Sequence, residues 1–146
     1  MPFDQFGPHD PVPGPGISIS QQNDDWTSPY TVTQTGEQAS ADDLLVPETD
    51  GYNIRELDWW FGLLKTGGFV DQDNYGLRVL ITISGIKVGI LDGSLKDGLH
   101  LNVDLYDAKG TVLVYLKNGT EVWTKFDLQS VSENYKEERE FKMLSI

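Results

Sequence analysis

The chain has 146 residues, a formal net charge of −12 and no cysteine. Its length suits one domain, and the missing thiols exclude disulfides, thiolate metal sites and cysteine nucleophiles. Its negative charge repels phosphate backbones, so we expect no nucleic-acid partner.

The N-terminal segment is rich in proline. Residues 1–16 hold five of the seven prolines, which predicts an extended arm outside the sheet ladders, because proline fixes φ and lacks an N–H donor. The arm lacks the basic start and apolar stretch of a signal peptide, and no apolar run is long enough to cross a membrane. We therefore expect a cytoplasmic protein without membrane contact, whose residues 17–146 form a single antiparallel β domain.

Two strands are predicted early in the chain. Residues 17–22 and 29–36 alternate in polarity and are rich in β-branched side chains, which is typical of strands. The polar, acidic segment 37–51 between them and the next apolar segment predicts a loop.

Residues 53–66 allow two interpretations. Asn53 and Glu56 have the spacing of a helix capping box. A helical stripe is formed by Leu57, Trp60, Phe61 and Leu64. We therefore predict one short helix, in which Trp59 would point outward. The competing interpretation is a strand, with one face formed by Leu57, Trp59, Phe61 and Leu63.

The segment 71–76 copies the first half of a calcium-binding loop, with Asp71, Asp73 and Gly76 at the expected positions. Position 12 of that pattern is Thr82 instead of a glutamate. We therefore predict a turn whose polar side chains bond to their own backbone, with a weak calcium site at Asp71 and Asp73 as the alternative. No cofactor is predicted.

From residue 77 onward the sequence predicts a β-meander. Its strands are expected at 77–83, 86–91, 99–106 and 141–146, with a hairpin over 107–128. The predicted fold is mainly β, either an antiparallel sandwich or a closed barrel.

Two turns fix the predicted register of the hairpin strands. Asn118-Gly119 predicts a two-residue type I′ turn, which places Leu113 opposite Thr124. The segment 107–111 fits a type I turn with a glycine bulge, which places Leu105 opposite Leu113.

This register predicts an apolar stripe on the face away from the core, formed by Val112, Val114 and Leu116. Burying each such side chain is worth about 1.5–3 kcal/mol, so we expect the stripe to be covered. The cover could be the chain itself, another copy that makes a homo-oligomer, or a ligand.

Trp123 lies beside this stripe, between polar neighbours. An aromatic ring stacks on a sugar while nearby polar groups fix its orientation, so we predict a ligand site on this face. The candidate ligand-binding residues are Trp123, Asp104, Asn102, Tyr106, Glu121 and Trp59.

These features favour a non-catalytic module that binds a carbohydrate or small polar ligand. The first alternative is a small β-barrel enzyme of the cyclase or isomerase type, whose pocket is lined by Trp59, Trp60 and Tyr106. The second is an acidic inhibitor or immunity-type protein for a basic partner, which the 13 acidic and two basic residues of segment 1–76 favour. The sequence carries no catalytic motif, so it does not decide whether the protein is an enzyme.

Overall fold

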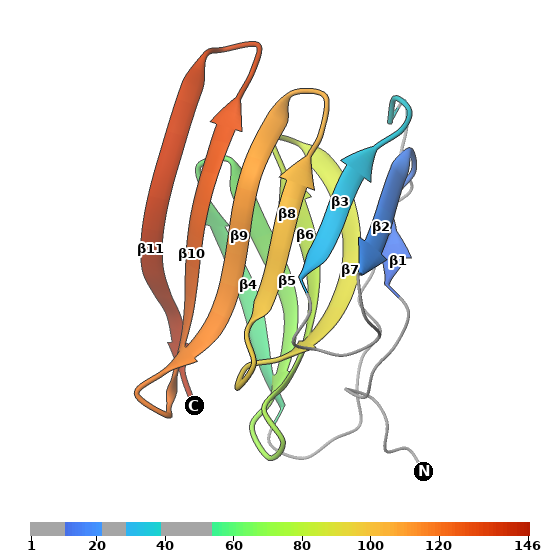
Figure 1. Ribbon diagram of the computed structural model, residues 1–146. Coiled ribbons are helices and arrows are strands. Elements are labelled where there is room, and N and C mark those ends of the chain that lie inside the picture. The colour runs from blue at the N-terminus through green and yellow to red at the C-terminus, as the bar shows by residue number, and fades with distance from the viewer. Residues whose placement is uncertain (1–10, 22–28, 39–53) are drawn as a thin grey trace.

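The computed structural model describes residues 11–21, 29–38 and 54–146, and within these ranges the chain forms strands and no helix. The strands build two sheets packed face to face (Figure 1). The sandwich alternative of the predicted fold is confirmed. None of the described segments is a helix that could cross a membrane.

Each sheet contains a meander of four consecutive strands. The five-stranded sheet has the order β1 (Val12–Pro13), β7 (Ile86–Ser94), β6 (Gly76–Ile83), β5 (Leu64–Asp71), β4 (Ile54–Phe61). The six-stranded sheet has the order β11 (Tyr135–Ser145), β10 (Glu121–Ser130), β9 (Ala108–Lys117), β8 (Leu99–Asp104), β3 (Tyr30–Gln34), β2 (Ile17–Gln21). Consecutive strands change sheet from β1 to β2, from β3 to β4 and from β7 to β8. One pairing among the described strands, β3 with β8, is parallel.

The end of the proline-rich arm joins the five-stranded sheet. Val12 and Pro13 pair with Ile90 and Gly89 of β7, so the prediction that the arm stays outside the ladders was wrong here. An edge strand tolerates proline because only one side of it needs hydrogen bonds. The rest of the predicted arm, residues 1–10, lies outside the described residues.

The predicted helix at 53–66 was wrong, and the competing strand interpretation is confirmed. β4 and β5 form a hairpin around Gly62 and Leu63, with Phe61 opposite Leu64. Gly62 has φ of 56°, which suits the first central position of a two-residue hairpin turn. Helical spacing and strand alternation were both present in this sequence, and pairing with β5 selected the strand.

Apolar side chains from both sheets meet in one core. Its fully buried members include Leu77, Val79, Ile81 and Leu91 of one sheet and Leu101, Val112, Val114 and Leu128 of the other. At the edge where β4 faces β11, four rings extend this core: Trp59, Phe61, Phe126 and Phe141. Trp59 and Phe61 therefore close one side of the sandwich.

The β9–β10 hairpin differs from the predicted register by one residue. Asn118-Gly119 adopts the positive φ values that the predicted turn requires, 57° and 77°. Thr120 nevertheless remains in the loop, so Leu113 lies opposite Lys125 instead of Thr124.

The β8–β9 connection differs more. The chain reverses at residues 106–107, where the Leu105 N–H donates to the Ala108 carbonyl over 2.8 Å. Leu113 consequently pairs with His100 rather than with Leu105, a shift of five residues. A shift by an odd number moves every side chain of a strand to the other face.

Gly110 explains why the predicted bulged turn does not form. It lies inside β9 with φ of 146°, and a Cβ there would come within 1.8 Å of the Asp127 carbonyl oxygen. The glycine therefore permits a close approach of two strands instead of a bulge in the turn.

The register change reverses the faces of β9. Val112 and Val114 are fully buried between the sheets and Leu116 packs against the core, while Leu113 and Tyr115 point outward. The chain itself thus covers the apolar stripe, which was one of the predicted alternatives. Val112 and Val114 lie inside the sandwich, so these two side chains are not placed to contact another copy.

Candidate functional site

The outer face of the six-stranded sheet carries a set of mostly polar side chains that adjacent strands place together. Three consecutive strands contribute His100, Asn102 and Asp104 from β8, Thr111, Leu113 and Tyr115 from β9, and Trp123, Lys125 and Asp127 from β10. Their opposite faces supply the core, so this sheet holds the outward side chains on a packed base.

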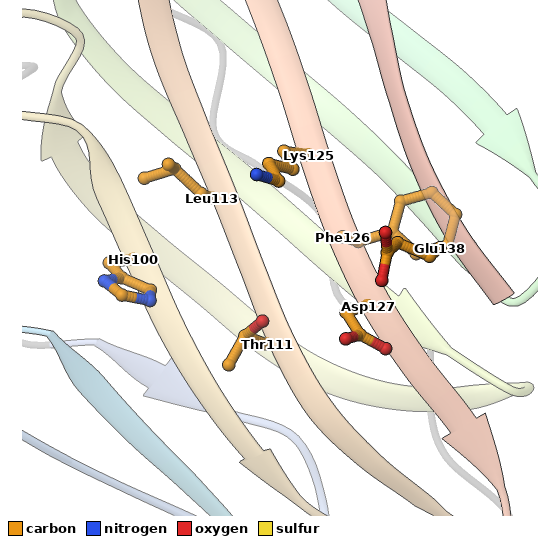
Figure 2. Close-up of a pocket in the computed structure, with 7 residues that line it drawn as sticks. All are labelled: His100, Thr111, Leu113, Lys125, Phe126, Asp127 and Glu138. Carbon is orange, nitrogen blue, oxygen red and sulfur yellow. The ribbon is translucent and has the colours of Figure 1, made fainter. Parts of the chain in front are cut away.

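A hollow of about 340 Å³ lies in the middle of this outer face (Figure 2). It is lined by His100, Thr111, Leu113, Lys125, Phe126, Asp127 and Glu138, which come from four adjacent strands. Figure 2 shows the Lys125 amine directed toward Leu113 and away from the carboxylates of Asp127 and Glu138. The hollow therefore offers donors and acceptors around a small apolar patch.

Two carboxylates face each other across the hollow's rim. Asp127 on β10 is directly opposite Glu138 on β11, and like charges in this position destabilise a sheet. Lys136 lies 3.8 Å from Asp127, but both side chains are largely exposed, so this ion pair offsets little of the repulsion. Local arrangements that oppose stability are expected where a protein has a function to perform.

Trp123 belongs to the cross-strand pair next to the hollow, and neighbouring side chains fix the orientation of its ring. The indole N–H donates to the Glu121 carboxylate over 3.0 Å, and the Lys117 ammonium lies 4.1 Å from the ring centroid. The indole hydrogen bond, followed by one from Asn118, lowers the pKa of Glu121. A ligand that stacks on the face near Lys117 has to displace this ammonium.

Tyr115 pairs with Trp123 across the strands and lies on the same side of the hollow. Its hydroxyl donates to the Glu140 carboxylate of β11. Desolvation, followed by this hydrogen bond, raises the pKa of Tyr115 to about 12. The bond from Tyr115 in turn lowers the pKa of Glu140. The aromatic end of the outer face is thus held in place by side-chain bonds across three strands.

The structure brings Trp123 to the same face as Asn102 and Asp104 but does not place them side by side. Trp123 is opposite Tyr115, whereas Asp104 is opposite Lys109, six residues further along β9. At about 3.3 Å per residue, Trp123 and Asp104 are roughly 20 Å apart along the strands. The predicted register had placed Trp123 and Asp104 at the same level of the sheet. The error in register therefore made the predicted site shorter than the distance that the structure gives.

The hollow occupies the space between these predicted residues. His100 and Leu113 form the row after Tyr115, and Thr111 forms the next row with Asn102. None of the residues that line the hollow was among the predicted ligand-binding residues. The signal that could have found His100, Lys125 and Asp127 was their strict alternation with buried residues on β8 and β10.

The remaining predicted residues lie elsewhere. Tyr106 is 56% exposed in the β8–β9 turn. Trp59 lies between the sheets, where its ring is 4.4 Å from Phe141 and its N–H donates to the Met143 carbonyl. Trp60 points outward from the five-stranded sheet. The three residues of the predicted barrel pocket are therefore apart: Trp59 lies between the sheets, Trp60 on an outer face and Tyr106 in a turn.

The segment 71–76 forms the predicted turn. The Asp73 N–H donates to the Asp71 carboxylate over 2.9 Å, and the Gly76 N–H donates to the Asn74 side chain over 2.8 Å. Among the residues that the structure describes, no group of three or more acidic or histidine side chains is placed to hold a metal ion.

Comparison with known proteins gives no match: no family model, curated protein or solved structure is significantly similar to this chain. Function therefore has to be inferred from the geometry of its own residues.

Proposed function

We propose that the protein is a non-catalytic binding module that holds a carbohydrate on the outer face of its six-stranded sheet. The observation that carries this proposal is the hollow lined from four strands, with Tyr115 and Trp123 at one end. Ligand sites combine apolar surface with a few polar groups that fix orientation. Sugars match this chemistry, because they present hydroxyls at their edges and C–H groups on their faces.

Length favours an oligosaccharide over a single sugar. The polar rows continue from Trp123 through the hollow to Asp104, roughly 20 Å along the strands. Beyond Asn102 and Asp104, the outer face continues with Thr31 and Thr33 of β3. A chain of hydroxylated rings could therefore contact several rows at once while the sheet stays rigid.

The charges of the hollow support the same ligand class. Asp127 and Glu138 are acceptors for sugar hydroxyls, and Lys125 is a donor. Hydrogen bonds that involve an ionised partner are about twice as strong as neutral ones. Two hydroxyls of one ligand, each donating to one carboxylate, would satisfy both acceptors.

A glycan array followed by calorimetric titration of the best oligosaccharide tests this proposal. Asp127→Asn should weaken binding about tenfold or more, the loss expected for one hydrogen bond to a charged group. Trp123→Ala should weaken it as well. The matched control is Asp58→Asn, which alters the opposite sheet and should leave the affinity for this ligand unchanged.

Two outcomes would contradict the proposal. One is an array without any bound glycan. The other is a bound glycan whose affinity does not respond to Asp127→Asn or to Trp123→Ala.

A further inference from the structure

The five-stranded sheet carries a second hollow, separate from the outer face of the six-stranded sheet. It has a volume of about 400 Å³ and lies at the end of the sheet where β4 turns into β5 and β6 turns into β7. Its lining residues are Trp60, Gly62, Leu63, Lys65, Thr82, Ser84 and Gly85. We call it the Trp60 hollow.

Trp60 is 74% exposed, the most exposed of the large apolar side chains in the described residues. Its indole N–H donates to the Gly62 carbonyl over 3.1 Å, which fixes the ring beside the hollow. A single exposed apolar side chain is ordinary on a protein surface. What sets Trp60 apart is the combination of a fixed ring, an adjoining hollow and a cation opposite it.

The base of the Trp60 hollow is held by both sheets. The Ser84 N–H donates to the Leu63 carbonyl over 2.8 Å, which ties the two turns together. The Leu63 N–H donates to the Glu137 carboxylate of β11, also over 2.8 Å. The turn below the ring is therefore preorganised, which reduces the entropy lost when a ligand binds.

Lys65 determines the charge of the ligand. It is the register partner of Trp60, and directly opposed residues have Cβ atoms about 5 Å apart. Among the described residues that line the Trp60 hollow, Lys65 alone is ionisable. The Glu137 carboxylate beneath the hollow is buried and accepts hydrogen bonds from the Leu63 N–H and the Tyr135 hydroxyl, so the exposed charge that faces a ligand is that of Lys65.

We propose that the Trp60 hollow binds a pyranose that carries a carboxylate, a sugar of the uronic-acid class. The ring of the sugar stacks on Trp60 and its carboxylate accepts hydrogen bonds from the Lys65 ammonium. The hydroxyls of Thr82 and Ser84 face the remaining polar edge of the sugar. This site stands independently of the proposed function, because it shares no residue with the other sheet's outer face.

A calorimetric titration with a glucuronic-acid tetrasaccharide and with a neutral glucose tetrasaccharide tests this inference. The wild-type protein should bind the acidic probe more tightly. Trp60→Ala should weaken binding of the acidic probe about tenfold or more, since it removes the stacking surface. Lys65→Ala should abolish the preference for the acidic probe.

A matched variant outside both hollows serves as the control. Lys96→Ala, which removes an exposed cation from the β7–β8 turn, should leave the affinity for the acidic probe unchanged. Because Trp60 and Lys65 are both exposed, their replacement should also leave the circular dichroism spectrum and the unfolding transition unchanged.

Three results would overturn the inference. The first is no binding of the acidic probe at millimolar concentration. The second is equal affinity for the two probes. The third is a concentration-dependent dimer, measured by light scattering, that Trp60→Ala dissociates, because the Trp60 hollow would then hold another copy of the chain.

Discussion

Trp59 and Trp60 are consecutive residues of β4 with opposite environments. Trp59 packs on Phe141 and bonds to the Met143 carbonyl, closing the sandwich at the β4–β11 edge. Trp60 is 74% exposed beside its hollow. The two residues have the same chemistry, so the difference comes from strand alternation alone. Residue type therefore indicates what a position can do. Strand phase, meaning whether the alternation points a side chain inward or outward, decides which role it takes.

The same contrast recurs on the other sheet and at its edge. Val114 is fully buried while Tyr115 faces outward, and Glu137 is 6% exposed while Glu138 borders the outer hollow. Even charged residues therefore follow strand phase. A buried carboxylate is tolerated at Glu137 because it accepts one hydrogen bond from the Leu63 N–H in the other sheet's turn and one from the Tyr135 hydroxyl on its own strand.

The largest expected difference is between the two tryptophans. Trp59→Ala should lower the free energy of unfolding by about 2–3 kcal/mol, because it removes packing between the sheets. Trp60→Ala should lower it by no more than about 0.5 kcal/mol. Urea unfolding followed by circular dichroism measures both values. Equal losses would show that phase does not separate the two positions.

A smaller difference is expected between the two glutamates. Glu137→Ala should lower the free energy of unfolding by about 1–3 kcal/mol, because the Leu63 N–H loses its acceptor. Glu137→Gln keeps an acceptor oxygen and should retain most of the stability. Glu138→Ala, the control on the outer side, should not lower the free energy of unfolding, because it removes the repulsion from Asp127. If Glu137→Ala unfolded like the wild type, the bond between the sheets would contribute nothing.

The smallest effect concerns Tyr115, on the outward phase of β9. Its pKa is raised from 10.0 to about 12, so the unfolded chain ionises this phenol more readily than the folded protein does. The stability that follows is present below about pH 10 and is lost as the pH rises toward 12. The pKa of Tyr135 is also raised, chiefly by its hydrogen bond to Glu137, so ultraviolet absorbance should show Tyr115 and Tyr135 among the late-titrating phenols. Tyr115→Phe should remove one of them, and an unchanged late titration in this variant would contradict the shift at Tyr115.

Local patterns in the sequence determined the strands and the all-β class. Alternation at 17–22, 77–83 and 99–106 predicted strands that the structure contains, and the Asp71–Gly76 turn formed as its side chains indicated. These features depend on neighbours within a few residues. Such contacts can be predicted from the local sequence without knowing the fold.

Register and pairing were decided by the tertiary structure. Gly110 could equally serve a bulged turn or a close strand approach, and the Asp127 carbonyl on the next strand selected the second. Segment 54–61 could alternate or form a helical stripe, and only its pairing with β5 and its contact with Phe141 selected a strand. The candidate site depends on register, because a shift by one residue moves side chains from one face to the other. The sequence by itself determined which side chains alternate, whereas the packing of two sheets around one core decided which of them face solvent.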